Sequence, residues 1–120
     1  MPMGVEFDLT DEAIDAHTHV IAVHGDVDLY SAPELRARLD ELIRAGKTRV
    51  LLDLRDTSFI DSTTLGVIVG AIKRLRVHSG ALALACDDPS ILRVFAITGL
   101  DQVIAVHATR EAGLAALRGE

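Results

Sequence analysis

The sequence predicts one α/β domain over residues 1–120, a mostly parallel (mixed) sheet of about five strands with about four helices packed against it. Short apolar runs of strand length alternate with longer segments in which apolar residues recur every three or four positions, as on one face of a helix. Three of the helical segments end at a glycine, Gly46, Gly80 and Gly99, a residue favoured at helix C-termini. Successive strand-helix-strand units require parallel pairing with right-handed crossovers, which gives the fold class.

Five segments have the composition of strands, and we expect them at 5–9, 19–24, 49–54, 81–85 and 103–106. The first alternates apolar and polar residues, which is typical of a half-buried strand. The polar stretch 10–15 is predicted to be a turn, so the first two strands should pair antiparallel. The remaining strands are separated by helices and should pair in parallel.

Each of the four helical segments begins at a residue suited to capping. Ser31 with Glu34 forms the sequence pattern of a capping box, Ser62 is expected at the N-cap of the second helix, Asp88 precedes a proline at the first helical position, and Thr109 caps the last helix. We expect Leu114 and Leu117 on the inner side of that last helix.

Composition excludes several classes of protein. The chain is 49% apolar and 25% charged, which is typical of a globular domain. A net charge of -6 gives no basic surface for nucleic acid. No apolar stretch approaches the roughly 20 residues of a membrane helix, and no signal peptide opens the chain, so we expect no direct membrane insertion. Cys86 is the only cysteine; it is expected to pack at a strand end, and its isolation suits a reducing cytosol.

Catalytic and metal-binding patterns are poorly supported. His17 and His19 would share a face of a strand, but no third ligand lies at a suitable spacing, so solvent-exposed edge histidines are the favoured interpretation. Ser62 lacks the motif of a nucleophile elbow, and Gly66 and Gly70 form no phosphate-binding loop. We therefore expect no enzyme activity, no metal and no cofactor.

A receiver domain has a similar length and alternation, and Asp53 resembles its phospho-accepting aspartate. That class also needs an acidic pair after its first strand and a lysine after its last, which this chain lacks. Asp53 is instead interpreted as a strand-end residue that helps to organise the loop before Ser62.

A different resemblance covers nearly the whole chain, in the right order. It is carried by Leu52-Asp53-Leu54 followed by Phe59-Ile60-Asp61-Ser62-Thr63-Thr64-Leu65-Gly66-Val67, by Gly25-Asp26-Val27-Asp28-Leu29 with Ala32-Pro33-Glu34-Leu35, by Gly80-Ala81-Leu82 and by Phe95-Ala96-Ile97-Thr98-Gly99-Leu100. These stretches resemble the anti-anti-sigma factors, the bacterial members of the STAS domain family. The resemblance implies a single STAS domain over residues 1–120.

The resemblance also implies a function. Ser62 would be phosphorylated by a partner that is both anti-sigma factor and serine kinase. The unmodified protein would capture this kinase in the cytoplasm and release the sigma factor, and a serine phosphatase would reset it. Thr63 and Thr64 are alternative acceptors of the phosphoryl group. Thr64 also departs from the family, which usually has glycine there, and its bulk beside the site could alter docking or phosphorylation.

Two features suggest a partner-binding surface around Ser62. Gly66, Gly70 and Lys73 follow Ser62 at helical spacing and form one stripe, whose smoothness fits close approach of another backbone or, equally, close packing within the domain. Asp26 and Asp28 offer carboxylates to basic groups of a partner, or form a solvated turn. The predicted surface comprises Asp26, Asp28, Asp61, Ser62, Thr63, Thr64, Gly66, Gly70 and Lys73.

Two other functions remain open at the level of sequence. The first is a STAS accessory subunit of a membrane lipid-transport complex, which need not be phosphorylated and for which Thr64 leaves room. The second is a small-ligand or nucleotide sensor, which no phosphate loop or pocket pattern supports.

Overall fold

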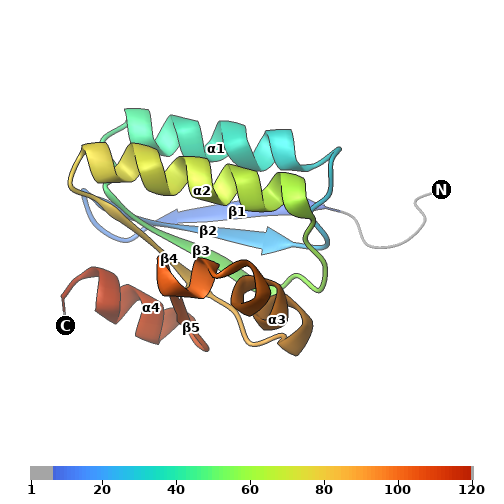
Figure 1. The fold of residues 1–120 in the computed structure, drawn as a ribbon. Helices are drawn as coiled ribbons and strands as arrows, with labels where there is room; N and C mark the ends of the chain where they lie inside the picture. The colour runs from blue at the N-terminus through green and yellow to red at the C-terminus, as the bar shows by residue number, and fades with distance from the viewer. Residues whose placement is uncertain (1–6, 120) are drawn as a thin grey trace.

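The computed structural model describes residues 7–119 and confirms the α/β class (Figure 1). In order along the chain the elements are β1 (Asp8–Ala13), β2 (Thr18–His24), α1 (Ala32–Arg44), β3 (Arg49–Asp56), α2 (Ser62–Val77), β4 (Ala81–Ala85), α3 (Pro89–Thr98), the short 3₁₀ helix η1 (Leu100–Gln102), β5 (Ala105–His107) and α4 (Arg110–Leu117). Within the described range, no helix is both long and apolar enough to span a bilayer.

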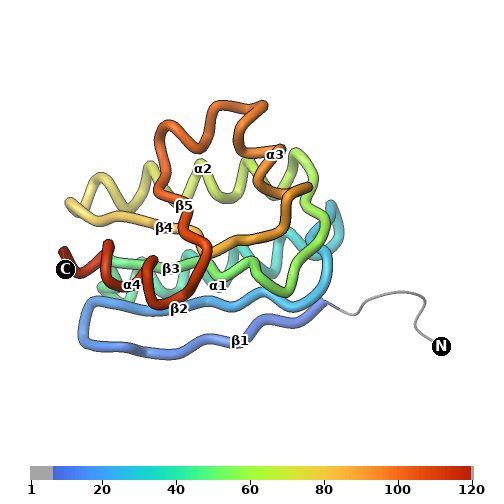
Figure 2. The backbone as a smooth tube through the Cα atoms, turned by 90° about the horizontal axis from the view of Figure 1, so that it is seen from below, coloured from blue at the N-terminus to red at the C-terminus, as the bar shows by residue number. Residues whose placement is uncertain are grey.

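The five strands form one sheet in the order β1-β2-β3-β4-β5. β1 pairs antiparallel with β2, and all other neighbours are parallel, as predicted. Because β2, β3 and β4 run in the same direction, the loops that follow them emerge at one end of the sheet (Figure 2). This end carries the candidate functional site described below.

The first and last strands differ from the prediction. Residues 10–13 continue β1 instead of forming a turn, because an edge strand with mostly exposed side chains needs no apolar alternation. The predicted positions 5 and 6 lie outside the described residues. β3 extends to Asp56, and β5 is confined to Ala105–His107 because Val103 belongs to the turn that closes η1.

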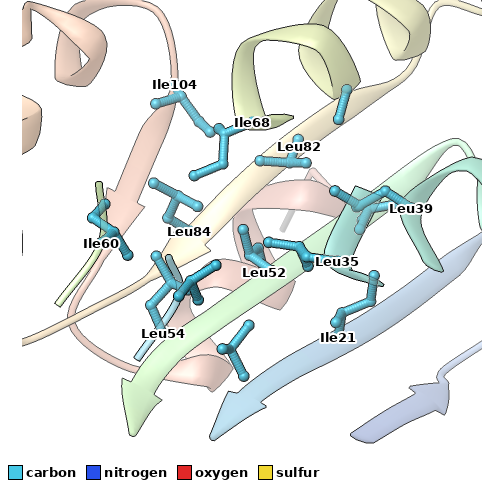
Figure 3. Packing of buried hydrophobic residues seen from close by; sticks show 14 of the residues in the cluster. Ile21, Leu35, Leu39, Leu52, Leu54, Ile60, Ile68, Leu82, Leu84 and Ile104 are labelled. Carbon is cyan, nitrogen blue, oxygen red and sulfur yellow. The ribbon is translucent and has the colours of Figure 1, made fainter. Parts of the chain in front are cut away.

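One face of the sheet is covered by α1 and α2, and it contains the main core (Figures 1 and 3). Leu35 and Leu39 of α1 pack with Ile21 and Leu52 of the sheet. α3 adds Phe95, which is fully buried in the same cluster. Apart from Phe95 and Cys86, the buried residues of this core are aliphatic, and the core is continuous from β1 to η1.

The other face is covered by α4, and its core is small. Leu51 packs there with Val20, Ala83 and Ala85, and with Leu114 and Leu117 as predicted for the last helix. Gly113 lets α4 approach closely, since a Cβ at this position would lie 2.6 Å from Cδ1 of Leu51. Small side chains on both sides of this interface therefore set the short distance between helix and sheet.

The two histidines near β2 are not alike. His17 is exposed as predicted, but His19 is buried, so its assignment as a solvent-exposed edge residue is wrong. Nε2 of His19 lies 2.9 Å from Oδ1 of Asp11, which also pairs with Arg38 of α1. This hydrogen bond from His19 is the main reason that the pKa of Asp11 is lowered, against the opposing effect of burial and with help from Arg38. Within residues 7–119 no cluster of metal-ligating side chains is present.

Asp53 lies inside β3, not at its end, and its predicted role in the loop before Ser62 is wrong. It is buried on the α4 face, where Oδ1 accepts from Nε of Arg55 at 2.9 Å and Oδ2 accepts from Nη2 at 2.8 Å. Burial raises the pKa of Asp53, but the hydrogen bonds and charge of Arg55 outweigh this effect, so the net shift is downward.

Cys86 directly follows β4 and is buried in the main core, as predicted for a packing residue. Burial raises the pKa of its thiol, and the carboxylates of Asp88 and Asp87 act in the same direction. These conditions favour the unreactive thiol form.

Candidate functional site

Ser62 is the first residue of α2, and the preceding residue caps the helix. Asp61 has extended backbone angles, and its Oδ1 accepts a hydrogen bond from the backbone N–H of Thr64 at 3.1 Å. The expectation that Ser62 is the N-cap is therefore wrong, since the Asp61 carboxylate satisfies the first turn instead. Ser62 is exposed, and its hydroxyl is not needed to cap the helix.

The two threonines after Ser62 face opposite environments. Thr63 is exposed. Thr64 is fully buried. Its hydroxyl is shared as a donor between two acceptors, the carbonyl oxygen of Val27 at 3.3 Å and Oδ1 of Asp61 at 3.2 Å. The bulk of Thr64 therefore points into the domain rather than onto the outer surface, and its hydroxyl is inaccessible to an enzyme in the folded protein.

The buried stripe of α2 explains this placement. Its buried residues are Thr64, Ile68, Ala71, Ile72 and Leu75. Leu65 is half-buried and packs against the main core. Thr64 lies on this stripe, four residues before Ile68, so its side chain is removed from the surface while Ser62 stays exposed.

The loops at residues 25–31 and 57–61, which we call the paired loops, lie side by side beyond the ends of β2 and β3. The N–H of Val27 donates to the carbonyl oxygen of Phe59 at 3.1 Å, and Val27 and Ile60 form a parallel bridge. Oδ1 of Asp26 accepts from Oγ of Ser58 at 3.0 Å. The structure therefore brings the Asp26 loop next to the Ser62 loop, as the sequence suggested.

Asp28 organises the start of α1. Its Oδ1 accepts from the backbone N–H groups of Tyr30, at 2.9 Å, and of Ser31, at 3.0 Å. These backbone hydrogen bonds lower the pKa of Asp28, and the bond from Ser31 has the largest effect. Ser31 makes no side-chain cap to α1, so the predicted capping box with Glu34 is wrong. The hydroxyl of Ser31 instead accepts from the N–H of Asp28 at 2.9 Å.

The glycine stripe of α2 faces outward. A Cβ at Gly66 would meet nothing within 4 Å, and one at Gly70 would meet only Nη1 of Arg74 at 3.6 Å. Close packing within the domain, one of the two explanations considered for these glycines, is therefore contradicted. A groove of about 300 Å³ runs along the stripe and is lined by Arg36, Thr63, Gly66, Val67, Gly70 and Arg74. Lys73 is exposed on the same helix.

The structure adds three residues that the sequence did not single out. Leu29, Tyr30 and Phe59 lie on the paired loops and are 59%, 89% and 50% exposed. The only signal in the sequence was a set of large apolar residues between polar ones in predicted loops, with no periodicity to assign them to a core. We call these three residues the apolar rim.

Comparisons with known proteins agree with this geometry. A family model described as the STAS domain matches residues 11–113. The anti-sigma-B factor antagonist of Bacillus subtilis (strain 168) is 35% identical over 112 residues, which cover 93% of this chain and 99% of that protein. The anti-sigma factor antagonist SpoIIAA in its unphosphorylated form superimposes with a TM-score of 0.81 at 28% identity, over 96% of this chain and 98% of the other. The phosphorylated form of the Bacillus cell fate determinant SpoIIAA gives a TM-score of 0.71 at 25% identity, over 91% and 96% of the two chains.

Proposed function

The chain belongs to the STAS domain family, and from this premise we propose that it is an anti-sigma factor antagonist switched by phosphorylation of Ser62. In the unmodified state it binds an anti-sigma factor that is also a serine kinase, and the sigma factor is released. Phosphorylation of Ser62 ends this binding, and a serine phosphatase restores it. The protein acts by binding, not as an enzyme, and it does so in the bacterial cytoplasm.

The observation that carries the proposal is that Ser62 is exposed at the start of α2 while a different residue, Asp61, caps the helix. Because Asp61 already caps α2, a phosphoryl group on Ser62 removes none of the capping hydrogen bonds. The helix N-terminus also favours an anion, through its free N–H groups and its macrodipole. Modification should therefore leave the fold intact and change only what the surface presents.

The surroundings of Ser62 explain how the modification would act on a partner. Phosphorylation adds about -1.5 to -2 charges to a surface that already carries Asp61, Asp26 and Asp28. A partner matched to the unmodified surface must then desolvate a dianion without new counter-charges. A loss of about 3 kcal/mol in binding free energy corresponds to roughly a hundredfold weaker affinity, which is sufficient for a switch.

The acidic pair has a second proposed role, contact with basic groups of the kinase. The Asp26 carboxylate links the paired loops through Ser58, and the Asp28 carboxylate orders its own loop through Ser31. Each uses Oδ1, so Oδ2 of each is the oxygen available to a partner. Contacts of this kind accelerate association and make it dependent on salt. Asp26→Asn should therefore slow association and reduce its salt dependence.

Thr64 no longer favours the accessory-subunit alternative. Its side chain is buried, so the outer surface around Ser62 is not altered by its bulk. The exposed hydroxyls at this helix start are those of Ser62 and Thr63, and the proposal assigns Ser62 as the acceptor because of the family resemblance.

The test uses the serine kinase recovered from the native host by its binding to the unmodified protein. Dissociation constants are measured for the wild type, Ser62→Ala and Ser62→Asp, with Thr63→Ala as the matched control. We expect Ser62→Ala to bind like the wild type and Ser62→Asp to bind about a hundredfold more weakly, while Thr63→Ala serves as the control for the site of phosphorylation. With ATP, intact mass should show one phosphoryl group on the wild type and Thr63→Ala, and none on Ser62→Ala. Equal affinity of all four proteins, or phosphorylation of Ser62→Ala, would reject the assignment.

A further inference from the structure

The apolar rim is exposed although the domain has a large core beside it. Tyr30 is 89% exposed and Leu29 is 59% exposed, while Val27, two residues earlier in the same loop, is fully buried. In the neighbouring loop Phe59 is 50% exposed and the adjacent Ile60 is buried. The chain therefore directs one apolar residue of each loop inward for stability and leaves the rim in solvent.

The rim is held in place before any partner binds. The carboxylate of Asp28 accepts from the N–H of Tyr30, and the N–H of Val27 donates to the carbonyl oxygen of Phe59. These bonds fix the backbone on both sides of the rim. A side chain on an ordered loop loses less conformational entropy when it is buried at an interface, which favours binding.

Carboxylates border the rim and restrict what can cover it. Asp26, Asp28 and Asp61 lie on the same paired loops, and the chain carries a net charge of -6. Such a border disfavours nucleic acid and anionic lipid, because both would bring phosphate groups against carboxylates. It also disfavours a second copy of this chain, since the same carboxylates would face one another. The remaining class is a protein surface with an apolar depression bordered by Lys or Arg.

We propose that the apolar rim is the affinity-determining part of the surface that binds the anti-sigma factor, and that this partner presents an apolar depression bordered by basic side chains. The inference rests on the proposed function, and it assigns the affinity for the partner and the switching of that affinity to two different features. Tyr30, Leu29 and Phe59 supply buried apolar area, and Ser62 supplies the charge that abolishes docking. Tyrosine is among the residues that most often dominate binding energy at interfaces.

Binding of the unphosphorylated protein to the same serine kinase tests this division. We compare the wild type with Tyr30→Ala and Leu29→Ala, and use Val77→Ala as the matched control. Val77 is 80% exposed and is the last residue of α2, about 22 Å along the helix axis from Ser62. Tyr30→Ala should weaken binding at least about tenfold, equally at low and high salt, by faster dissociation. Val77→Ala should bind like the wild type, and the thermal midpoints of all variants should agree with that of the wild type.

Each other outcome has a definite meaning. If the wild type binds the kinase and Tyr30→Ala and Leu29→Ala both bind equally well, the rim is not the anchor, although the proposed function stands. If the unmodified wild type captures no serine kinase from the native host, the proposed function fails and this inference with it. Sedimentation of the protein alone is the third arm, because self-association that Tyr30→Ala abolishes would assign the rim to a second copy and overturn the proposal.

Discussion

The two faces of the sheet are built in different ways. Leu51 and Leu52 are consecutive and fully buried residues of β3, yet they enter different cores. Leu52 packs among large aliphatic side chains under α1 and α2, whereas Leu51 meets alanines and the short helix α4. The paired loops and α2 contribute residues to the main core. The proposed switch therefore lies on the most extensively packed part of the domain. This arrangement explains how a surface hydroxyl can be modified without disturbing the fold.

The largest expected effect compares these two leucines directly. We expect Leu52→Ala to lower the free energy of unfolding by about 3–5 kcal/mol and Leu51→Ala by about 2–3 kcal/mol. Both changes remove the same atoms, but the cost depends on how far the surroundings can collapse into the cavity. α4 is a helix of eight residues and can settle onto the sheet more readily than the paired helices α1 and α2. Equilibrium unfolding in urea provides the measurement.

Hydrogen exchange separates this explanation from a general difference in burial. Leu51→Ala should speed the exchange of α4 amides selectively, while Leu52→Ala should affect the whole sheet. If Leu51→Ala costs as much as Leu52→Ala and α4 amides exchange as slowly as in the wild type, the two faces do not differ in the way described.

Asp53, a buried carboxylate on the α4 face, gives the second effect. Its pKa lies below the ordinary value of 3.8 because Arg55 outweighs the effect of burial. A carboxylate with a lowered folded-state pKa stabilises the protein above the unfolded-state pKa, and this stability is lost as the pH falls through the folded-state value. Asp53→Asn should therefore cost about 1 kcal/mol at pH 7, allowing for the solvent that reaches Arg55. The difference from the wild type should shrink as the pH falls below about 4.

Urea titrations at several pH values between 7 and 3 measure this difference. Other carboxylates also have lowered pKa values, such as Asp11 and Asp88. Their contributions to the free energy of unfolding are lost over the same pH range in the wild type and in Asp53→Asn, so only the difference between the two proteins reports on Asp53. A cost that stays constant from pH 7 to 3 would show that Asp53 acts through packing and not through its charge.

The sequence allowed much of this architecture to be predicted, and the errors have physical causes. The order of strands and helices followed from apolar periodicity, which is a strong signal when strands are buried on both faces. β1 was placed too early because an edge strand has few apolar contacts to impose a pattern. Asp61 and Ser62 are both good capping residues, so their order at the helix start did not determine which one would cap. The burial of Thr64 was missed because its polar side chain conceals its place on the stripe of Ile68.

The smallest expected effect concerns Thr64, a buried polar residue of α2. Thr64→Val keeps the shape of the side chain but removes the hydroxyl that bonds the carbonyl oxygen of Val27. We expect a loss of about 1 kcal/mol in the free energy of unfolding and faster exchange of the Val27 N–H, which donates to Phe59. Thr64→Ser retains the hydroxyl and should leave that exchange unchanged, although it loses a buried methyl group. Because this bond connects α2 to the loop that carries Asp26 and Asp28, Thr64→Val should also loosen the surface around Ser62 while leaving Ser62 itself exposed. Unchanged exchange at Val27 in Thr64→Val would mean that the backbone pairing of the two loops is sufficient to hold that surface without the threonine.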